Sequence, residues 1–242
     1  MKIQGIFLFE MSSGNIHTPS TQLQEILALP LEQQREILAK LKQLDAAERR
    51  EAARDDFILF VKECWPGFVE GYHHRIMADA FQKVVQGKLK RVIINMAPRH
   101  TKSEFASHML PAYYLGHHPT EYIIQASNTA DLAVDFGRKV RDTISTDEYH
   151  NIFPQTQVHP DVAAAGKWKT TKKGEYFALG TGGTMTGRGG NLIILDDPHS
   201  EQEAKQAESR PEIYDSVFEW YTSGPRQRVQ PGAAIVIVMT RW

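Results

Sequence analysis

The chain alternates between short runs of consecutive apolar residues and longer segments with helical spacing. The apolar runs predict core strands at residues 91–97, 121–127, 191–197 and 234–240. The intervening segments predict helices at residues 57–65, 73–87, 103–116, 128–145 and 201–223. Continuous apolar strands separated by helices indicate a mainly parallel sheet that is covered on both faces. We therefore expect a three-layer α/β fold in which ligands bind beyond the carboxyl ends of the strands.

Turn and capping residues refine these elements. Gly87 is suited to end the second helix, and an Asn-Thr pair is suited to cap the helix at 128–145. Pro111 predicts a break within the third helix, because proline removes a backbone donor and its ring clashes with the preceding turn. Residues 167–183 have the pattern of a β-hairpin.

The first 54 residues differ from the rest of the chain. Residues up to about 20 are rich in Ser, Thr and Asn, which is typical of a mobile terminus. From residue 21 the pattern is helical, with leucines at positions 31, 38, 41 and 44, and Pro30 stands where a second helix could begin. Either this arm packs on the body or it forms a coil that binds a partner. We expect a mobile segment and helical arm at 1–54 and a body at 55–242.

Composition narrows the class of protein. A hydrophobic content of 41% over 242 residues is enough for a folded core. The formal charge of −1 means that any polyanion must be met by a local patch. The one cysteine, Cys64, forbids an internal disulfide and suits a reducing compartment. No apolar run approaches the roughly 20 residues that span a bilayer, so we expect a cytoplasmic protein without a membrane partner.

Polar residues follow every predicted core strand. The sequences after the four strands are PRHTKS, Ser127-Asn128, Asp196-Asp197 and Thr240-Arg241. The carboxyl ends of parallel strands meet at one edge of a sheet, so these residues are expected to lie together.

The segment after the first strand has the ending of a phosphate-binding loop. Such a loop supplies backbone N–H groups at a helix N-terminus, a lysine that reaches the phosphates, and a hydroxyl for Mg²⁺. Lys102 and Ser103 match the lysine and the hydroxyl, but Met96 and Thr101 replace the two glycines of G-x-x-x-x-G-K-[ST]. The β-branched Thr101 resists positive φ. Taken alone, the segment fits a nucleotide loop and an ordinary strand-to-helix turn equally well.

Side chains could compensate for the missing glycines. Pro98 removes one N–H donor, whereas Arg99 could supply a second cation for the phosphates. The candidate nucleotide-binding segment comprises Pro98, Arg99, His100, Thr101, Lys102, Ser103 and Glu104.

The third strand supplies the acids that such a site requires. Asp196 fits the role of a Mg²⁺ ligand and Asp197 that of a carboxylate that orients the attacking water. The alternative is a solvated Asp-Asp-Pro turn that only closes the strand. It is less favoured than the Mg²⁺ site, because Lys102 and Ser103 follow another strand of the same sheet. In the glycine-rich segment Gly180–Gly190, Arg188 is either a surface arginine or one that reaches a phosphate in its own subunit or a neighbour's.

Other site chemistries lack their patterns. The ten histidines and Cys64 show no zinc spacing, and no G-x-S-x-G elbow or Ser-His-Asp set stands out. Aromatic residues near residues 153, 168 and 220 could stack on bases, but core or interface roles explain them more simply.

As a set, three segments resemble the ATPase domain of tailed-bacteriophage terminase large subunits, the motors that drive viral DNA into procapsids. They are PRHTKSE, TGRGGNLIILDDPHS and IVIVMTRW, in this order. The resemblance covers residues 55–242 and implies a P-loop NTPase of the ASCE or RecA-like kind. Family members carry glycine where this chain has Thr101.

The resemblance implies roles for individual residues. Lys102, Ser103 and Arg99 would hold the phosphates of ATP and Mg²⁺. Asp196 would lie on the Mg²⁺ side and Asp197 would be the catalytic carboxylate.

Four further roles are implied at a distance from the phosphate loop. Thr240 would belong to the motif that couples hydrolysis to DNA movement. Arg188 would lie where some members project a finger into the next subunit of a ring, and Tyr72 and His73 where adenine contacts are common.

The resemblance also implies binding partners, and it implies an activity that this chain is not expected to have. Double-stranded DNA, the portal protein and the small terminase subunit would be partners of a ring homo-oligomer, in host cytoplasm and docked on a procapsid, with a monomer possible in isolation. Full-length large subunits continue into a nuclease, whereas this chain stops at Trp242, so we expect no DNA cleavage.

The sequence therefore predicts a Mg²⁺-dependent ATPase that powers DNA translocation. A helicase-like nucleic-acid motor is one alternative. The other is a non-hydrolysing nucleotide- or DNA-binding scaffold, against which the paired Asp196-Asp197 argues, because a dead site has no need of two adjacent acids.

Overall fold

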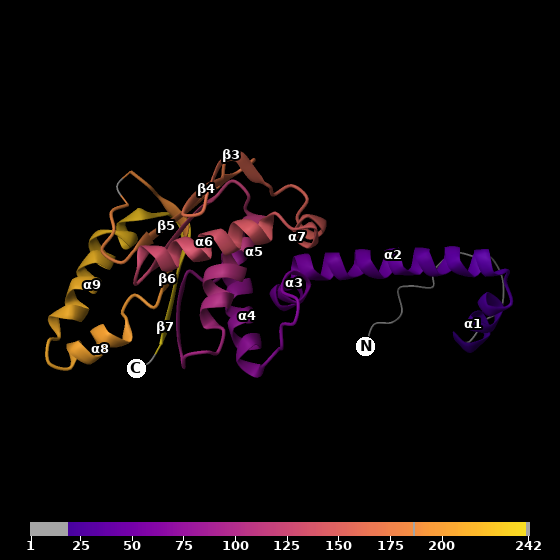
Figure 1. Ribbon diagram of the computed structural model, residues 1–242, viewed down its shortest axis with the longest axis horizontal. Coiled ribbons are helices and arrows are strands. Elements are labelled where there is room, and N and C mark those ends of the chain that lie inside the picture. The colour runs from indigo at the N-terminus through magenta and orange to yellow at the C-terminus, as the bar shows by residue number, and fades with distance from the viewer. Residues whose placement is uncertain (1–18, 186, 241–242) are drawn as a thin grey trace. The chain divides into compact units, whose positions relative to one another are not determined.

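The computed structural model describes residues 19–185 and 187–240. Its strands form one sheet with helices on both faces (Figure 1). The helices are α1 (Pro19–Leu27), α2 (Leu31–Asp55), α3 (Phe57–Cys64), α4 (Tyr72–Val85), the π-helix η1 (Glu104–Met109), α5 (Leu110–His117), α6 (Ala130–Ile144), α7 (Asp147–Ile152), α8 (Glu201–Ala207), α9 (Glu212–Ser223) and the 3₁₀-helix η2 (Pro225–Arg228). The strands are β1 (Arg91–Met96), β2 (Tyr122–Ser127), β3 (Val158–Ala164), β4 (Lys167–Thr170), β5 (Glu175–Gly180), β6 (Gly190–Asp196) and β7 (Val229–Thr240).

The sheet has the strand order β1-β7-β6-β2-β5-β4-β3. The first five strands in this order are parallel, and β4 and β3 continue the sheet in antiparallel pairing. The predicted three-layer α/β fold with a mainly parallel central sheet is confirmed. One strand, β7, lies between β1 and the acidic strand β6, so the ends of all three meet at the carboxyl edge, which we define as the carboxyl ends of the parallel strands.

Each face of the sheet has its own apolar core. On one face, side chains such as Leu192 and Val236 pack with the helices from α3 to α7. On the other face a smaller cluster, which includes Ile193 and Ile235, packs with Trp220 of α9. Alternate residues of β6 and β7 therefore enter opposite cores, which explains why these strands are continuously apolar in the sequence.

Several predicted elements are confirmed locally. Gly87 follows α4 with φ of 70°, the left-handed conformation that favours glycine at a helix end. Thr129 caps α6 by accepting a hydrogen bond from the Leu132 N–H. The predicted hairpin is the antiparallel pair β4 and β5.

The break predicted near Pro111 is a change of helix type and not an interruption. The chain stays helical through this residue, but the π-helix η1 ends at Met109 and the α-helix α5 begins at Leu110, directly before the proline. The wider π turn accommodates the proline ring, which would clash with the preceding turn of a regular α-helix.

Two other features differ from the sequence prediction. The segment predicted as one helix at 201–223 is two helices, α8 and α9, because Pro211 cannot continue the first. Strand β3 was missed because it is an edge strand with a proline, a register shift and only partial burial, which leaves little periodic signal.

The chain divides into two compact units, which meet between Glu48 and Arg49 within α2, whereas the domain boundary predicted from composition lies at residues 54/55. The last turn of α2 belongs to the second unit. Ala53 is fully buried there, and Arg54 donates two hydrogen bonds to the Ile152 carbonyl, at 3.0 and 2.8 Å.

The first unit contains α1 and most of α2. As expected, a second helix begins after Pro30, and the Gln34 amide bridges to α1 by donating to the Leu27 carbonyl at 3.0 Å. Leu38 and Leu44 are exposed, so the arm does not bury an apolar face within itself. The predicted mobile segment before residue 19 lies outside the described residues. No helix in the described ranges is long and apolar enough to cross a membrane.

Candidate functional site at the carboxyl edge

The residues that follow β1, β6 and β7 meet at the carboxyl edge. The Lys102 ammonium donates to Asp197 Oδ2 at 2.9 Å and to Thr240 Oγ1 at 2.7 Å. Thr240 in turn donates to Asp197 from its backbone N–H (2.5 Å) and from its hydroxyl (3.1 Å). Lys102 is only 6% exposed, and a buried ammonium needs such partners. Three residues that lie about 40 to 140 positions apart in the sequence thus form one polar cluster.

A second cluster surrounds Asp196. Ser103 donates to Asp196 Oδ1 at 2.9 Å and Ser107 donates to Oδ2 at 2.8 Å. Gln125, in the middle of β2, donates to the Ser107 hydroxyl at 3.1 Å. Sequence reasoning missed Ser107 and Gln125. The available signals were the spacing of four between Ser103 and Ser107, which puts both on one helix face, and a glutamine within the apolar strand YIIQAS.

Burial makes Asp196 hard to ionise. Its side chain is 1% exposed, and this desolvation raises its pKa to about 6, although hydrogen bonds from Ser107 and Ser103 act in the opposite direction. The negative charge of Asp197 adds to the rise and Lys102 opposes it. A cation bound beside Asp196 would favour the ionised carboxylate and so lower its pKa.

Backbone strain concentrates at the same edge. Four non-glycine residues in the described chain have positive φ, and three of them, Arg99 (62°), Thr101 (60°) and Asp197 (41°), lie in the loops after β1 and β6. Such conformations cluster at functional sites because the surrounding structure must enforce them. Thr101 therefore adopts the left-handed conformation for which most phosphate loops use glycine.

His74 explains how a threonine is held there. The Gly71 N–H donates to His74 Nδ1 at 2.8 Å, so the ring proton lies on Nε2. His74 Nε2 lies 2.5 Å from Thr101 Oγ1, and the threonine hydroxyl donates to the His100 carbonyl at 2.6 Å. Burial, and then the neighbouring His73, lower the pKa of His74, which keeps the ring neutral. Sequence reasoning missed His74 because nothing local links it to a loop 27 residues away.

The other predicted nucleotide contacts lie at varying distances from this cluster. Arg99 and His100 are exposed on the loop, as is Pro98. The His73 ring lies beside the loop, 5.8 Å between ring centroids from His100, and its Nε2 is buried without a partner in the described chain. Tyr72 is 80% exposed at the start of α4.

Glu104 is engaged elsewhere. Its carboxylate is paired with Lys139 of α6 and with His108, whose Nδ1 lies 2.9 Å away. Burial alone would raise its pKa, but these two partners lower it to about 2. Glu104 therefore ties the start of η1 to α6.

Arg188 lies at the other end of the sheet. It pairs with Glu175, the first residue of β5, at 2.6 Å, and its guanidinium stacks 3.9 Å from the centroid of the Phe177 ring. β6 begins two residues later and must run its whole length before reaching Asp196. The structure thus does not bring Arg188 to the loop after β1 of its own chain, and a role in a neighbouring subunit stays a prediction.

The end of β2 contributes less directly. Ser127 is paired in register with Asp196, but its buried hydroxyl has no partner in the described chain. Asn128 donates to Glu203 of α8 at 2.7 Å, which fixes the helix that follows the acidic strand.

A hollow of about 440 Å³ adjoins the Lys102 cluster. Its lining residues are Asn95, Asp197, His199, Ala204, Tyr214, Met239 and Thr240. They come from the ends of β1, β6 and β7 and from α8 and α9, so the hollow opens between the sheet and these two helices.

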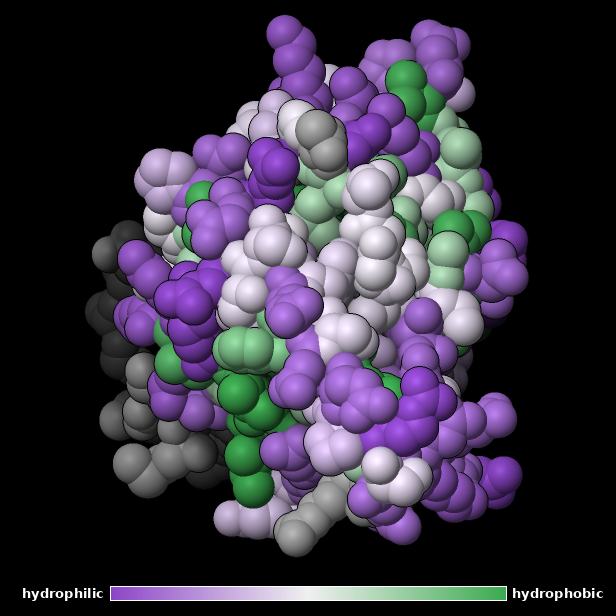
Figure 2. All heavy atoms as spheres, turned by 90° about the vertical axis from the view of Figure 1, so that its left-hand side faces the viewer, coloured by the Kyte–Doolittle hydropathy of each residue, from purple (hydrophilic) through white to green (hydrophobic). Residues whose placement is uncertain are grey.

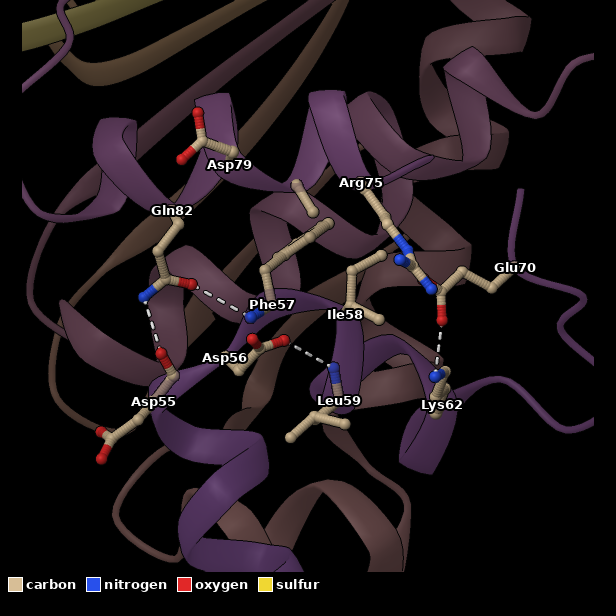
Figure 3. Close-up of a pocket in the computed structure, with 11 residues that line it drawn as sticks. Asp55, Asp56, Phe57, Ile58, Leu59, Lys62, Glu70, Arg75, Asp79 and Gln82 are labelled. Carbon is tan, nitrogen blue, oxygen red and sulfur yellow. Dashed lines mark hydrogen bonds and ion pairs between the residues drawn. The ribbon is translucent and has the colours of Figure 1, made fainter. Parts of the chain in front are cut away.

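A hollow of similar size, about 450 Å³, lies between α3 and α4 and contains none of the predicted site residues (Figure 3). Several of its polar groups already have partners: Glu70 pairs with Lys62 at 2.6 Å and with Arg75, and Asp56 caps α3. The two hollows have similar volumes, but only the one at the carboxyl edge is lined by residues of the Lys102 cluster. The carboxyl edge is therefore the candidate site.

The donor set at this edge fits Mg²⁺. This ion prefers oxygen ligands and is commonly held by one or two carboxylates together with substrate phosphates. Asp196 and the Ser103 hydroxyl provide such oxygens side by side. Within the described residues no group of three or more His, Cys, Asp and Glu side chains could hold a metal by itself.

The comparisons with known proteins gave the following results. No protein-family model matches the chain, and no curated protein matches its sequence. Among solved structures, the HK97 bacteriophage large terminase superposes with a TM-score of 0.46 and 14% identity, covering 80% of this chain and 37% of that one. A mutant of the ATPase domain of the Thermus phage P74-26 large terminase superposes with a TM-score of 0.43 and 16% identity, covering 75% and 69%. The chain thus spans well under half of the HK97 protein.

Proposed function

We propose that the chain is a Mg²⁺-dependent ATPase whose hydrolysis drives double-stranded DNA, as the ATPase domain of a terminase large subunit does. The observation that carries the enzymatic part is the meeting of Lys102, Asp197 and Thr240 beside the Ser103–Asp196 pair. This set joins the groups that phosphoryl transfer needs: a phosphate-binding cation, ligands for Mg²⁺ and a carboxylate for water. The DNA-packaging part rests on the sequence resemblance.

Each residue has a role in binding or in catalysis. Lys102 binds the β- and γ-phosphates, and the exposed Arg99 on the loop adds positive charge beside them. Asp197 orients the attacking water: three of the roughly four acceptor positions of its carboxylate are used in the structure, which leaves one for water. Thr240 contacts both Lys102 and Asp197, so it is placed to sense a change at either.

Ser103 and Asp196 would hold Mg²⁺. When bound, this ion neutralises charge on the phosphate oxygens in the transition state. Ser107 keeps the Asp196 carboxylate in a fixed orientation, because it donates to Oδ2, the oxygen that Ser103 does not contact. Gln125 holds Ser107 in turn by donating to its hydroxyl.

Partners beyond the nucleotide follow from the same proposal. The portal protein and the small terminase subunit would bind a ring of these chains docked on a procapsid in the host cytoplasm. Arg188 would act on the site of the adjacent chain in such a ring.

Phosphate release tests the enzymatic part. Lys102→Ala and Asp197→Asn are each expected to lower Mg²⁺- and ATP-dependent phosphate release by about 10²-fold or more, because each removes a preorganised charge at the reacting centre. Full activity in either variant would overturn the role of that residue. If the unaltered chain binds ATP without releasing phosphate, the non-hydrolysing scaffold is the better description.

A further inference from the structure

Cations gather at the end of the sheet opposite the candidate site. We define this amino edge as the segments that lead into the parallel strands: residues 86–91, 117–122, 169–175, 187–191 and 224–231. They carry nine Lys or Arg residues, namely Lys88, Lys90, Arg91, Lys169, Lys172, Lys173, Arg188, Arg226 and Arg228, and only two acids, Glu121 and Glu175. Since the formal charge of the whole chain is −1, the remaining surface carries a net negative charge.

Both acids at this edge are already engaged. Glu175 pairs with Arg188 at 2.6 Å and lies 3.5 Å from Lys169, whereas Glu121 accepts from the Tyr114 hydroxyl. Within residues 19–185 and 187–240, the other seven cations form no ion pair. They are Lys88, Lys90, Arg91, Lys172, Lys173, Arg226 and Arg228. All except Arg228 are exposed.

The unpaired cations form two groups rather than a single cluster. One group lies before β1 and β7 and the other in the turn before β5, and four strand spacings of about 4.8 Å separate β1 from β5. The two groups are therefore about 19 Å apart, which matches about six base pairs of a DNA duplex at about 3.4 Å per step. Figure 2 shows hydrophilic residues at its upper margin, the direction in which this edge lies in Figure 1, as it does along its other margins.

We propose that the amino edge binds the phosphate backbone of double-stranded DNA. Unpaired, solvated cations gain affinity by displacing the counterions that condense on a duplex, and they need no fixed hydrogen-bond geometry to do so. The proposal rests on the proposed function for the identity of the polyanion, but it places the contact away from the ATP site and assigns it to particular residues.

The composition of the edge favours a duplex over a single strand. Proteins that bind single strands add aromatic platforms on which bases stack. Of the large aromatic side chains exposed in the described part of the chain, which are Tyr72, Tyr122, Tyr214 and Phe218, only Tyr122 lies at this edge. The cations of this edge are therefore suited to bind the phosphate backbone of a duplex through charge.

A salt titration of the full chain tests the proposal. The edge variant is Lys88→Ala/Lys90→Ala/Lys172→Ala/Lys173→Ala. The control replaces four exposed lysines elsewhere: Lys40→Ala/Lys42→Ala/Lys62→Ala/Lys205→Ala. Binding of a 30-base-pair duplex is followed by fluorescence anisotropy between 50 and 200 mM salt. Loss of four phosphate contacts should make the slope of log K against log salt shallower by about 3.6, at about 0.9 per contact. The control should keep the slope of the unaltered chain.

The outcomes separate this proposal from the ATPase assignment. The edge variant should keep its ATP turnover in the absence of DNA, since none of its four lysines lies at the carboxyl edge. An unchanged salt slope in the edge variant overturns the DNA-binding edge even if ATP is hydrolysed. Conversely, an edge-dependent slope in a chain that hydrolyses no ATP upholds the edge and overturns the ATPase. Tighter binding to phosphatidylserine vesicles than to the duplex, abolished by the edge variant, would also overturn it in favour of a membrane surface.

Discussion

The two ends of the same parallel strands carry opposite kinds of electrostatics. Among the described residues at the carboxyl edge, the loops and first helical turns hold two cations, Arg99 and Lys102, and six carboxylates: Glu104, Asp131, Asp196, Asp197, Glu201 and Glu203. Lys102 and Asp196 are buried there and Asp197 is partly buried, and each of the three is held by hydrogen bonds from or to neighbouring side chains. At the amino edge nine cations meet two acids, and seven of the cations, six of them exposed, have no ion pair in the described chain.

Burial explains the difference. A charge removed from water must find partners, so Lys102 and Asp196 are each held by two or more hydrogen bonds with set geometry. An exposed charge has no such need, and a surface of this kind can bind a polyanion through charge density alone. One edge thus holds its charges at fixed positions, as the proposed ATP chemistry requires, whereas the other leaves its charges in solvent, as the proposed DNA contact requires.

The largest expected effect tests whether the edges work independently. Lys102→Ala should reduce ATP turnover by about 10²–10³-fold, because it removes the cation nearest the reacting phosphates. Its affinity for duplex DNA, measured without nucleotide, should stay within about twofold of that of the unaltered chain. A parallel loss of DNA binding would mean that the edges are not separate sites.

The next effect concerns the threonine of the phosphate loop. His74→Ala should raise the KM for ATP up to about tenfold, because the hydrogen bond that holds Thr101 at positive φ is lost. A Thr101→Gly variant should tolerate the loss of His74, since glycine adopts positive φ without a hydrogen bond from a side chain.

The rescue distinguishes positioning from general stability. In the double variant His74→Ala/Thr101→Gly, KM should return to within about threefold of the value for Thr101→Gly alone, even if thermal stability stays reduced. A double variant as weak as His74→Ala would show that the histidine acts through something other than the loop.

A third test uses the proton on Asp196. The folded pKa of about 6 lies above the ordinary value of 3.8, so this group stabilises the metal-free fold at low pH and loses that contribution as pH rises through 6. Mg²⁺ competes with the proton, and the rise in Tm on adding Mg²⁺ should therefore be larger at pH 7.5 than at pH 5.

Ser107 provides the control for this pH dependence. Ser107→Ala removes a hydrogen bond that lowers the Asp196 pKa, so the pH at which the Mg²⁺ effect appears should move upward. A Mg²⁺-induced change in Tm that is the same at both pH values would argue against Asp196 as a ligand.

The smallest effect is expected at Arg188. Its ion pair with Glu175 and its stacking on Phe177 are both only partly buried, so Arg188→Ala should cost about 1 kcal/mol of unfolding free energy. Turnover per chain in dilute solution should be unchanged, and only the increase seen on self-association should be lost. Reduced turnover in the dilute variant would show that the arginine acts within its own subunit.

Some of the site was visible in local sequence patterns. Lys102-Ser103 after an apolar strand and Asp196-Asp197 at the end of another are short-range signals, and parallel strands bring their carboxyl ends together by construction. Ser107, Gln125 and His74 were missed because their roles depend on which helix face or strand face meets the site. The same limit applies to Arg188, because the composition of its loop did not indicate toward which end of the sheet the arginine lies.

The fold class and the identity of the chemical groups follow from the sequence alone. Continuous apolar strands alternating with helices can bury their backbone and side chains only in a sheet covered on both faces, and the polar residues at strand ends must then lie at its rims. Tertiary structure decided how those groups are used. The strand order put β7 between β1 and β6 and so joined Thr240 to Lys102 and Asp197, and α4 supplied the histidine that lets Thr101 stand where glycine is usual. Both depend on contacts between residues far apart in the chain, whose geometry no local pattern encodes.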